Sequence, residues 1–493
     1  MDPLSFYLYR TMGSLALGPA LVKPIIKGRF GTRWNDRLGY TLCGGGQPIW
    51  LHGASVGEVG SNLALLSAIR ALGYQGQALL TSATPAGLDY LENHLPKWSS
   101  EKSGPHLSHT QIAAPPLDFL GAPGRFLDRL APRALLVIET EIWPELFFQC
   151  HKRSIPVFLL SARLSQRSYQ RLSMFQGFIN RILKTIALAA TISQSDCSRL
   201  VDLGVSPDKT VVIGSPKFDR LIALAKERLS NLSQKFNLDL ADQNNWAKLD
   251  LTPIKSKKPL ILAGSTHPGE EELILSKVLA LKESTAALAL APRHLERVPQ
   301  IMELIKAYGL LPLRFSENSS LRGPADSVVV IDQIGQLSSL YQECDLAIVG
   351  GSFFDGAGHN PLEPVAAGKP VIFGPNMSSF KAEADDLESL GAAWAAPKDI
   401  LLTAINRCLS QPELAFKAGL IGLNYLAGKR AVAPILAQAV LNFLSEPSPL
   451  GQKKALDYLF NQALQAEQES ALGQTLDSPS RSDRTVDLQT LDP

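Results

Sequence analysis

The sequence predicts an α/β protein with two doubly wound domains, each a parallel sheet covered by helices on both faces. Two observations carry this prediction. From about residue 47 onward, short apolar runs alternate with amphipathic stretches, which is the pattern of parallel strands joined by crossover helices. The chain has 493 residues, 45% of them hydrophobic and 19% charged, so it is too long for one ordinary domain.

The apolar runs predict two series of strands. The first series is 48–51, 78–81, 135–138, 157–160, 186–192 and 211–213. The second series is 259–263, 286–290, 327–331, 346–349 and 371–373. A polar stretch at about 230–258 separates them and indicates a flexible excursion. Because ligands of such sheets bind at the carboxyl ends of the strands, the loops that follow these runs are where function is expected.

Composition divides the chain into five segments. They are a membrane-surface anchor (1–40), a first α/β domain (41–213), a linker with a flexible insertion (214–258), a second α/β domain (259–445) and a mostly disordered tail (446–493). The tail is rich in Ser, Pro, Gln and Asp and poor in aromatic residues, although residues 453–464 are compatible with a helix.

Residues 4–26 are apolar and aromatic, but charged residues, glycines and prolines interrupt them, which argues against an uninterrupted transmembrane helix. No convincing signal-cleavage site follows. Basic residues beside apolar ones suit the anionic surface of a bilayer. These basic residues are Arg10, Lys23, Lys27, Arg29, Arg33 and Arg37. We therefore expect an anchor on the cytoplasmic face of the membrane; the alternative is a helix pair that packs on the first domain.

Charge and cysteine content exclude other classes of protein. The formal net charge is +2, and no basic stripe is interleaved with aromatic residues, so nucleic acid is not expected as a partner. The five cysteines form no Cys-x-x-Cys pair and have no histidine at ligand spacing; they are Cys43, Cys150, Cys197, Cys344 and Cys408. This pattern predicts a reducing compartment and no structural zinc.

Residues 350–375 have the pattern of a strand, a glycine loop, a helix start and a second strand. They contain GGSF at 350–353, GHNPLEP at 358–364 and PVIFGP at 370–375. Asn360 is a suitable N-cap, Pro361 suits the first helical position, and Glu363 lies three residues after the cap. The free amides of such a helix end attract an anion, typically a phosphate. Two interpretations stay open: these residues only cap the helix, or they also bind a ligand.

The segment GASVGE at 53–58 ends a strand and begins a helix. The apolar face of this helix is predicted to be Val59, Leu63, Leu66 and Ile69. Ser55 and Glu58 have the spacing of a capping box. The flanking glycines also leave the backbone open to a ligand, so that Glu58 would lie at the mouth of a cleft and could act as a general base.

Two further loops carry charged side chains. ETEIWP at 139–144 follows a buried strand, and two carboxylates at one strand end are costly unless a cation, hydroxyl or amide meets them. We expect one of Glu139 and Glu141 to be functional and the other structural. GSPKFD at 214–219 places Lys217 where the first domain leads into the second, a position that suits a phosphate or carboxylate. The alternative is an ordinary exposed lysine.

The loop GSTHPGE at 264–270 offers another helix N-terminus to the predicted cleft. Thr266 either caps this helix or faces the ligand. His267 and His294 are candidates for contact with a phosphate or carboxylate, or are structural histidines. No Asp-x-Asp cluster follows a strand of the first domain, so no metal site is expected.

Six motifs in this order resemble those of the 3-deoxy-D-manno-octulosonic acid (Kdo) transferases. They are GASVGE, ETEIWP, SARLS at 161–165, GSPKFD, APRH at 291–294 and HNPLE at 359–363. The resemblance extends to about residue 430. It implies a glycosyltransferase-B fold, in which two Rossmann-like domains face each other, with the acceptor on the first and a CMP-activated sugar on the second. It also implies inverting transfer of Kdo to a lipid A precursor in lipopolysaccharide synthesis, at the inner membrane and without a cofactor.

The resemblance also implies roles for single residues. Glu58 matches the general base, and Glu139 and Lys217 match residues credited with stabilising the transition state. The implied donor site comprises Pro292, Arg293, Ile334, Gly335, Gln336, Asn360, Pro361, Leu362 and Glu363. Glu363 would accept hydrogen bonds from a ribose diol. Gln336 stands where family members often carry Glu, which keeps a hydrogen-bonding group but removes a charge.

Two alternatives remain. The same fold could use a different activated sugar or a different lipid acceptor, because a fold does not fix its substrate. Binding of CMP rather than UDP separates these cases. A membrane-tethered binding protein without catalysis is the other alternative, against which the presence of Glu58, Glu139 and Lys217 argues.

Overall fold

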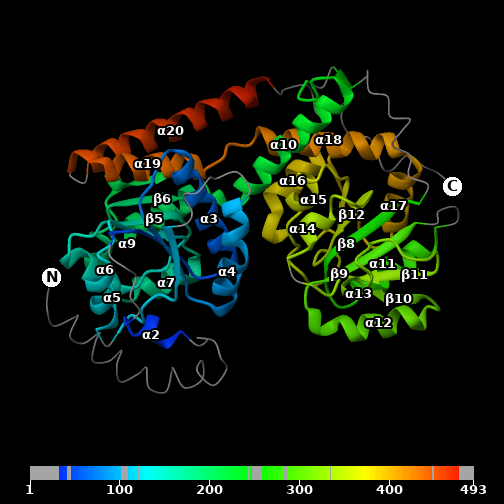
Figure 1. Cartoon of the computed structure of the whole chain (residues 1–493). Helices are drawn as coiled ribbons and strands as arrows, with labels where there is room; N and C mark the ends of the chain where they lie inside the picture. Colours follow the sequence, from blue (N-terminus) through cyan, green and yellow to red (C-terminus); the bar gives the residue numbers. More distant parts are fainter. Residues whose placement is uncertain are drawn as a thin grey trace. The chain divides into compact units, whose positions relative to one another are not determined.

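A computed structural model of the chain describes residues 33–40, 46–100, 109–119, 121–242, 245–246, 258–281, 286–333, 335–446 and 449–476. The chain divides into two units, one formed by Met1–Asp219 with Ala431–Pro493 and the other by Arg220–Arg430 (Figure 1). Each unit contains a seven-stranded sheet in which every paired strand is parallel. The prediction of two parallel α/β domains is therefore confirmed.

The first sheet has the strand order β3-β2-β1-β4-β5-β6-β7. Its strands are β1 (Ile49–Gly53), β2 (Ala78–Ser82), β3 (Thr110–Ala113), β4 (Ala134–Ile138), β5 (Val157–Ala162), β6 (Leu188–Thr191) and β7 (Thr210–Val212). The central strands are buried along their whole length, which explains why they read as continuous apolar runs.

Helices cover both faces of the first sheet. One face packs against α3 (Val56–Ala71), α4 (Pro85–Ser100), α19 (Ala433–Ser445) and α20 (Pro449–Leu476). The other packs against α5 (Ala122–Leu130), α6 (Pro144–Lys152), α8 (Gln176–Leu183) and α9 (Gln194–Leu203), with α7 (Gln166–Ser173) beside α8 and α9. The predicted apolar face of α3 is confirmed, because Val59, Leu63, Leu66 and Ile69 are all buried in this core.

The end of the chain departs from the expected domain limits. Residues 431–445 were assigned to the second domain, yet Leu436, Val440 and Phe443 of α19 lie in the core of the first unit. The expected disordered tail contains α20, whose Leu456 and Leu459 join the same core. Figure 1 shows α19 and α20 side by side on the first unit. Residues 477–493 lie outside the described residues.

The second sheet has the order β10-β11-β9-β8-β12-β13-β14. Its strands are β8 (Leu260–Thr266), β9 (Ala287–Pro292), β10 (Leu311–Arg314), β11 (Ser327–Val330), β12 (Leu346–Val349), β13 (Val371–Phe373) and β14 (Ala393–Ala395). Helices α11 (Glu270–Leu279), α12 (Val298–Ala307) and α17 (Leu401–Ser410) cover one face, and α14 (Leu337–Leu340) packs on the other. The unit also contains α13 (Phe315–Asn318), α15 (Leu362–Ala366), α16 (Lys381–Ser389) and α18 (Pro412–Gly428).

The first half of the segment expected to be a linker (214–258) is helical. The 3-10 helix η3 (Pro216–Phe218) leads directly into α10 (Asp219–Phe236), which covers only the start of the stretch expected to be flexible, 230–258. Residues 243–244 and 247–257 lie outside the described residues.

Two of the basic residues expected to face a bilayer do not do so. Arg37, in the short helix α2 (Trp34–Arg37), is 2% exposed and donates to the carbonyl of Ala83 at 3.0 Å. Arg33 forms ion pairs with Glu92 and Asp36. Both side chains therefore have partners on the first unit, and Arg37 is buried there. The remaining anchor residues, 1–32, lie outside the described residues.

Candidate functional site

Each sheet has a switch point, where the direction of strand order reverses. In the first unit this point lies between β1 and β4, and in the second between β8 and β12. Ligands of doubly wound sheets bind outside the carboxyl ends of the strands at this point. The motifs singled out in the sequence follow these four strands and also β5, β7 and β9, so the fold places them at the carboxyl edge of each sheet.

Glu58 lies in the first turn of α3, directly after β1. The Ser55 hydroxyl caps the helix by accepting from the Glu58 amide at 3.4 Å, and it donates to Glu58 Oε1 at 2.7 Å. The amide of Ala54 donates to Glu58 Oε2 at 2.6 Å. A Cβ on Gly53 would lie 2.9 Å from the Cβ of Glu58, so a larger residue would displace this side chain. The half-buried carboxylate of Glu58 can therefore take part in these bonds and still accept a hydrogen bond from a ligand, because each oxygen keeps a free lone pair.

Glu139 follows β4 with a left-handed backbone, φ 61°. Burial raises the pKa of its carboxyl above the ordinary value, and the negative charge of Glu58 raises it further, whereas Arg163 and Lys217 oppose the shift. These charge interactions place Glu58, Glu139 and Lys217 near one another, although they come from three separate segments. The three predicted catalytic residues therefore form one cluster of charges in the first unit.

Glu141 is the third carboxylate of this cluster. Trp143 Nε1 donates to its Oε2 at 2.9 Å, and the Trp143 ring packs edge-on against His52 with ring centroids 5.0 Å apart. Burial raises the pKa of Glu141, the hydrogen bond from Trp143 opposes the shift, and the charges of Glu58 and Glu139 add to it. The indole of Trp143 gives Glu141 the structural partner that we expected for one of the two carboxylates.

Lys217 is exposed within η3, whose first amide is capped by Ser215 at 3.3 Å. Two residues later, Asp219 is buried, and its carboxylate accepts hydrogen bonds from the amides of Val432, at 3.0 Å, and Ala433. This contact fixes the start of α19. The Lys217 loop is thus tied to a helix more than two hundred residues further along the chain.

The glycine loop after β12 holds a carboxylate of the protein, a contact that the sequence analysis does not predict. The amides of Gly351, Ser352 and Phe353 donate to the carboxylate of Glu270 at 2.7, 2.9 and 3.0 Å. The amide of His267 donates to the same carboxylate at 2.9 Å. Glu270 is fully buried. The amides of this loop therefore bind an anion supplied by the protein itself.

Three histidines gather at the carboxyl edge of the second sheet. His267 Nε2 and His359 Nε2 are 2.8 Å apart, and the rings of His267 and His294 have centroids 5.9 Å apart. Burial, together with the charges of His267, Arg293 and His294, lowers the pKa of His359 to about 4. Arg293 lies at the end of β9, after the buried Pro292, and is exposed. The predicted donor residue Arg293 is therefore beside the histidine cluster.

Thr266 does not cap the helix that follows it. It belongs to β8, and its hydroxyl donates to Glu271 at 2.8 Å. Glu271 is 1% exposed and pairs with both terminal nitrogens of Arg297, at 2.7 and 3.1 Å. Thr266 therefore belongs to a buried structural network.

Asn360 caps the following helix as predicted, and Glu363 lies in its first turn, but the helix begins one residue later than expected. The N-cap position of α15 falls on Pro361, but Asn360 Oδ1 still accepts from the amide of Leu362 at 3.1 Å. Pro361 and Leu362 are buried, whereas Glu363 is half-buried and lines a cavity of about 180 Å³. Residues of α10 and α14 complete this cavity. Asn360 thus supplies the cap, whereas Glu363, whose Oε1 accepts from Asn360 Nδ2 at 3.4 Å, faces a space that a ligand can enter.

Gly335 and Gln336 are exposed immediately before α14. Gly335 has φ 83°, a backbone conformation that favours glycine. Side chains of α14 and of Tyr341 lie against Gly264 at the end of β8, which places the start of α14 near the switch point. Ile334, the remaining donor residue, lies outside the described residues.

Sequence reasoning did not single out two residues of the site. Arg163, next to Glu139, follows β5 within the SARLS motif, and His359 immediately precedes Asn360. Arg163 lies in the SARLS motif and His359 in the HNPLE motif, and membership of these motifs is the sequence signal that identifies them.

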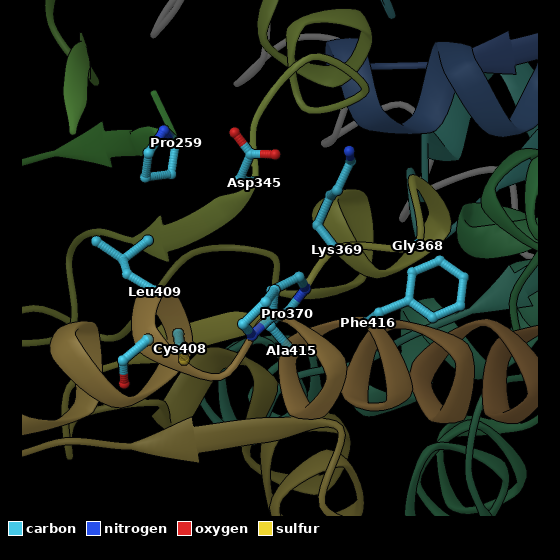
Figure 2. A pocket seen from close by; sticks show the side chains of 11 residues that line it. Pro259, Asp345, Gly368, Lys369, Pro370, Cys408, Leu409, Ala415 and Phe416 are labelled. Carbon is cyan, nitrogen blue, oxygen red and sulfur yellow. The ribbon is translucent and has the colours of Figure 1, made fainter. Parts of the chain in front are cut away.

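Figure 2 shows a cavity of about 340 Å³ in the second unit that lies away from these residues. Its lining residues Pro259, Asp345 and Pro370 directly precede β8, β12 and β13, so the cavity lies at the amino edge of the sheet. Lys369 also lines it, and burial lowers the pKa of this lysine. Because the motifs follow the carboxyl ends of the strands, this cavity is separate from the candidate site.

The chain was compared with known proteins. The family described as 3-Deoxy-D-manno-octulosonic-acid transferase (kdotransferase) matches residues 32–220. The chain is 32% identical over 357 residues to the 3-deoxy-D-manno-octulosonic acid transferase of Bordetella pertussis, covering 71% of this chain and 76% of that protein. It is 29% identical over 371 residues to a bifunctional glycosyltransferase/methyltransferase of Fusobacterium nucleatum, and this match covers 74% of the chain but only 53% of that protein.

A solved structure, the C-terminal CMP-Kdo binding domain of WaaA from Acinetobacter baumannii, is 23% identical and covers 42% of this chain and 100% of that one, with a TM-score of 0.33. This structural similarity is too low to support an argument. The sequence matches, together with the two parallel α/β units, define the protein as a glycosyltransferase. The chain belongs to the family of 3-deoxy-D-manno-octulosonic acid transferases.

Two further observations concern membranes and metals. Within the described residues, no helix has the length and apolar character needed to cross a bilayer. The expected anchor at 4–26 lies outside those residues and stays a prediction. In the same part of the chain, no three His, Cys, Asp or Glu side chains are grouped so that they could hold a metal ion.

Proposed function

We propose that the protein transfers Kdo from CMP-Kdo to a lipid A precursor, with inversion at the anomeric carbon. The observation that carries this proposal is the charge cluster of Glu58, Glu139 and Lys217, in which Glu58 and Glu139 follow the switch-point strands β1 and β4 and Lys217 follows β7. Membership of the Kdo transferase family supports the same reaction. The cluster offers both a proton acceptor and a cation, which transfer from an anionic donor requires.

In this mechanism Glu58 acts as the general base. An acceptor hydroxyl oxygen forms a bond with the anomeric carbon of Kdo while the bond from that carbon to the CMP phosphate oxygen breaks. The hydroxyl proton passes to Glu58, and the electron pair of the broken bond leaves with CMP. Attack from the face opposite the leaving group inverts the anomeric carbon. The partial exposure of Glu58 allows a hydroxyl to approach it.

Lys217 and Glu139 support this step electrostatically. The donor phosphate and the Kdo carboxylate are anionic, and the exposed ammonium of Lys217 stabilises negative charge that develops there. Glu139 orients Lys217 and Arg163, since the charges of both reach it.

The second unit supplies the donor site. We propose that Arg293 and the neighbouring histidines contact the phosphate and that Glu363 accepts hydrogen bonds from the ribose hydroxyls. Pro292, Ile334, Gly335, Gln336, Asn360, Pro361 and Leu362 complete this site. This assignment is supported by the position of these residues, which follow the carboxyl ends of strands in the second sheet. Ile334 is an exception, because it lies outside the described residues.

We further propose the glycosyltransferase-B arrangement, in which the carboxyl edges of the two sheets face each other during catalysis. The donor carbon and the acceptor oxygen must come within bonding distance while water is excluded from the hydrolysable donor. The acceptor would enter from the cytoplasmic face of the inner membrane. A related enzyme with another activated sugar or lipid acceptor is the alternative.

The proposal is tested by mass spectrometry of the lipid after incubation with CMP-Kdo, a lipid A precursor and EDTA. A mass gain of one or more Kdo units supports the donor, the acceptor class and metal independence together. The control is thermal unfolding of the protein with CMP and with UDP, where CMP should stabilise the fold and UDP should not. If the protein passes this control but leaves the lipid unchanged both with and without EDTA, this acceptor is rejected and the alternative is favoured.

A further inference from the structure

The hairpin formed by α7 and α8 carries an unusual set of side chains. Residues 163–184 contain five basic residues and no Asp or Glu. The basic residues are Arg163, Arg167, Arg171, Arg181 and Lys184. The whole chain has a net charge of only +2, so this concentration of positive charge is local.

The turn between the two helices exposes two large apolar side chains. Met174 is 72% exposed and Phe175 is 66% exposed, more than any other large hydrophobic side chain in the described ranges. The two residues are adjacent: Met174 directly follows α7, and Phe175 directly precedes α8. Two exposed apolar residues at the tip of a hairpin indicate contact with something other than water.

The inner face of the hairpin is firmly packed. Tyr169, Leu172 and Phe178 pack against the core of the first unit. The Tyr169 hydroxyl donates to Asp202 Oδ2 at 2.6 Å, and Gln176 Nε2 donates to the carbonyl of the same residue at 3.1 Å. The tip is therefore held in place, so its exposed apolar residues are not a consequence of a loosely attached loop.

The outer face combines charge with apolar character. Arg167, Arg171 and Met174 are four and three residues apart, so they lie along one side of α7. Arg167 and Arg171 are both exposed, and neither forms an ion pair in the part of the chain that the structure describes. On the neighbouring helix α9, the carboxylate of Asp202 is bonded to Tyr169.

We propose that the α7–α8 hairpin docks on an anionic lipid bilayer, with Met174 and Phe175 in the interface and the arginines at the lipid phosphates. Basic residues at the level of anionic headgroups, with apolar side chains projecting beyond them, are the features of an interfacial membrane element. Phosphates alone would explain the arginines but leave the two apolar side chains in water.

Because of the position of the hairpin, its contact with the bilayer would bring the proposed catalytic residues close to the membrane surface. The hairpin begins at the carboxyl end of β5, beside β4, and Arg163 at its base lies close enough to Glu139 to influence its pKa. A docked hairpin therefore holds the carboxylate cluster near the bilayer surface. The biological meaning of this contact rests on the proposed lipid acceptor, whereas the contact itself can be measured without substrate.

The test uses sedimentation of the full chain with vesicles of phosphatidylcholine, with and without phosphatidylglycerol. Each basic residue near an anionic surface contributes roughly a fivefold factor in binding, so Arg167→Gln/Arg171→Gln should weaken binding to the anionic vesicles roughly 25-fold. Met174→Ser/Phe175→Ser should weaken it roughly tenfold but keep its dependence on salt.

Matched controls remove two exposed cationic side chains or two exposed apolar side chains elsewhere. Lys226→Gln/Lys417→Gln neutralises two exposed lysines of the second unit, and Leu72→Ser/Leu390→Ser removes two exposed leucines. Both should bind anionic vesicles like the wild type. Hairpin variants that bind like the wild type, or controls that lose as much binding as the hairpin variants, would overturn the proposal.

A second measurement does not depend on disrupting the hairpin. A polarity-sensitive fluorophore on Met174→Cys should shift its emission to the blue on anionic vesicles, while the same label on Leu72→Cys should not. An unshifted label at position 174 would also overturn the proposal. These results are independent of catalysis, so vesicle binding without transfer would reject the proposed reaction and leave the docking surface intact.

Discussion

The Nε2 atoms of His267 and His359 lie 2.8 Å apart at the carboxyl edge of the second sheet. Two nitrogens at this distance form a hydrogen bond only when one carries a proton and the other does not. Burial, reinforced by the charges of its neighbours, lowers the pKa of His359 to about 4, so this residue is neutral at pH 7. His359 is therefore the uncharged member of the pair in the pH range where the enzyme is expected to work.

This arrangement predicts a specific dependence of stability on pH. The pKa of His359 falls from 6.5 in the unfolded chain to about 4 in the folded protein, so the unfolded chain binds its proton first. The contribution of the neutral histidine is complete above pH 6.5 and is lost as the pH falls toward 4. His359→Gln should reduce the loss of unfolding free energy between pH 7 and 4, measured by urea denaturation. Parallel curves for the wild type and variant would contradict this assignment.

Replacing Glu139 by glutamine should make the protein more stable but less active. Burial and the charge of Glu58 raise its pKa, so the ionised form is held at a cost in the folded state. That cost is present above the raised pKa and disappears as the carboxyl becomes protonated at low pH. Glu139→Gln should therefore raise the unfolding temperature at pH 7, with little effect at pH 4, while lowering the transfer rate roughly hundredfold. A variant that is less stable at pH 7 would show that Arg163 and Lys217 outweigh the cost of burial.

Glu270 should prove structural. Its buried carboxylate accepts from the amides of His267, Gly351, Ser352 and Phe353. Glu270→Gln replaces one acceptor oxygen by a donor that faces these amides, which should cost roughly 3 kcal/mol of unfolding free energy. The neighbouring Glu272 is exposed on the same helix, so Glu272→Gln is the matched control and should be neutral. Equal stability of the two variants would exclude this role for Glu270.

The central strands could be predicted from the sequence because parallel strands buried on both faces form continuous apolar runs. The edge strands β3, β10 and β14 could not. They are short, and β3 and β10 are only partly buried, so their sequences lack such a run. The return of α19 to the first unit was also not predictable, since its apolar face would suit the core of either domain. The folded structure fixes that choice through the packing of Leu436, Val440 and Phe443 in the first core and the hydrogen bond from the Val432 amide to Asp219.

The site shows the same division. Motif positions placed Glu58, Glu139 and Lys217 at strand ends, and the fold brings them together. The role of Glu270 could not be read from its position, because it appears as an ordinary acidic residue in a first helical turn. Its partner loop begins 81 residues later, at Gly351. A local pattern identifies a loop rich in free amides, but only the folded structure shows which anion occupies it.

The most direct test of the account is the single-turnover transfer rate of Glu58→Gln, compared with the wild type at equal CMP occupancy. Glutamine keeps the size of the side chain and can still accept a hydrogen bond, but it cannot take the proton of the acceptor hydroxyl. We predict unchanged CMP binding and a transfer rate lower by roughly a hundred- to ten-thousand-fold. A near-normal rate with normal CMP binding would contradict the assignment of Glu58 as the general base.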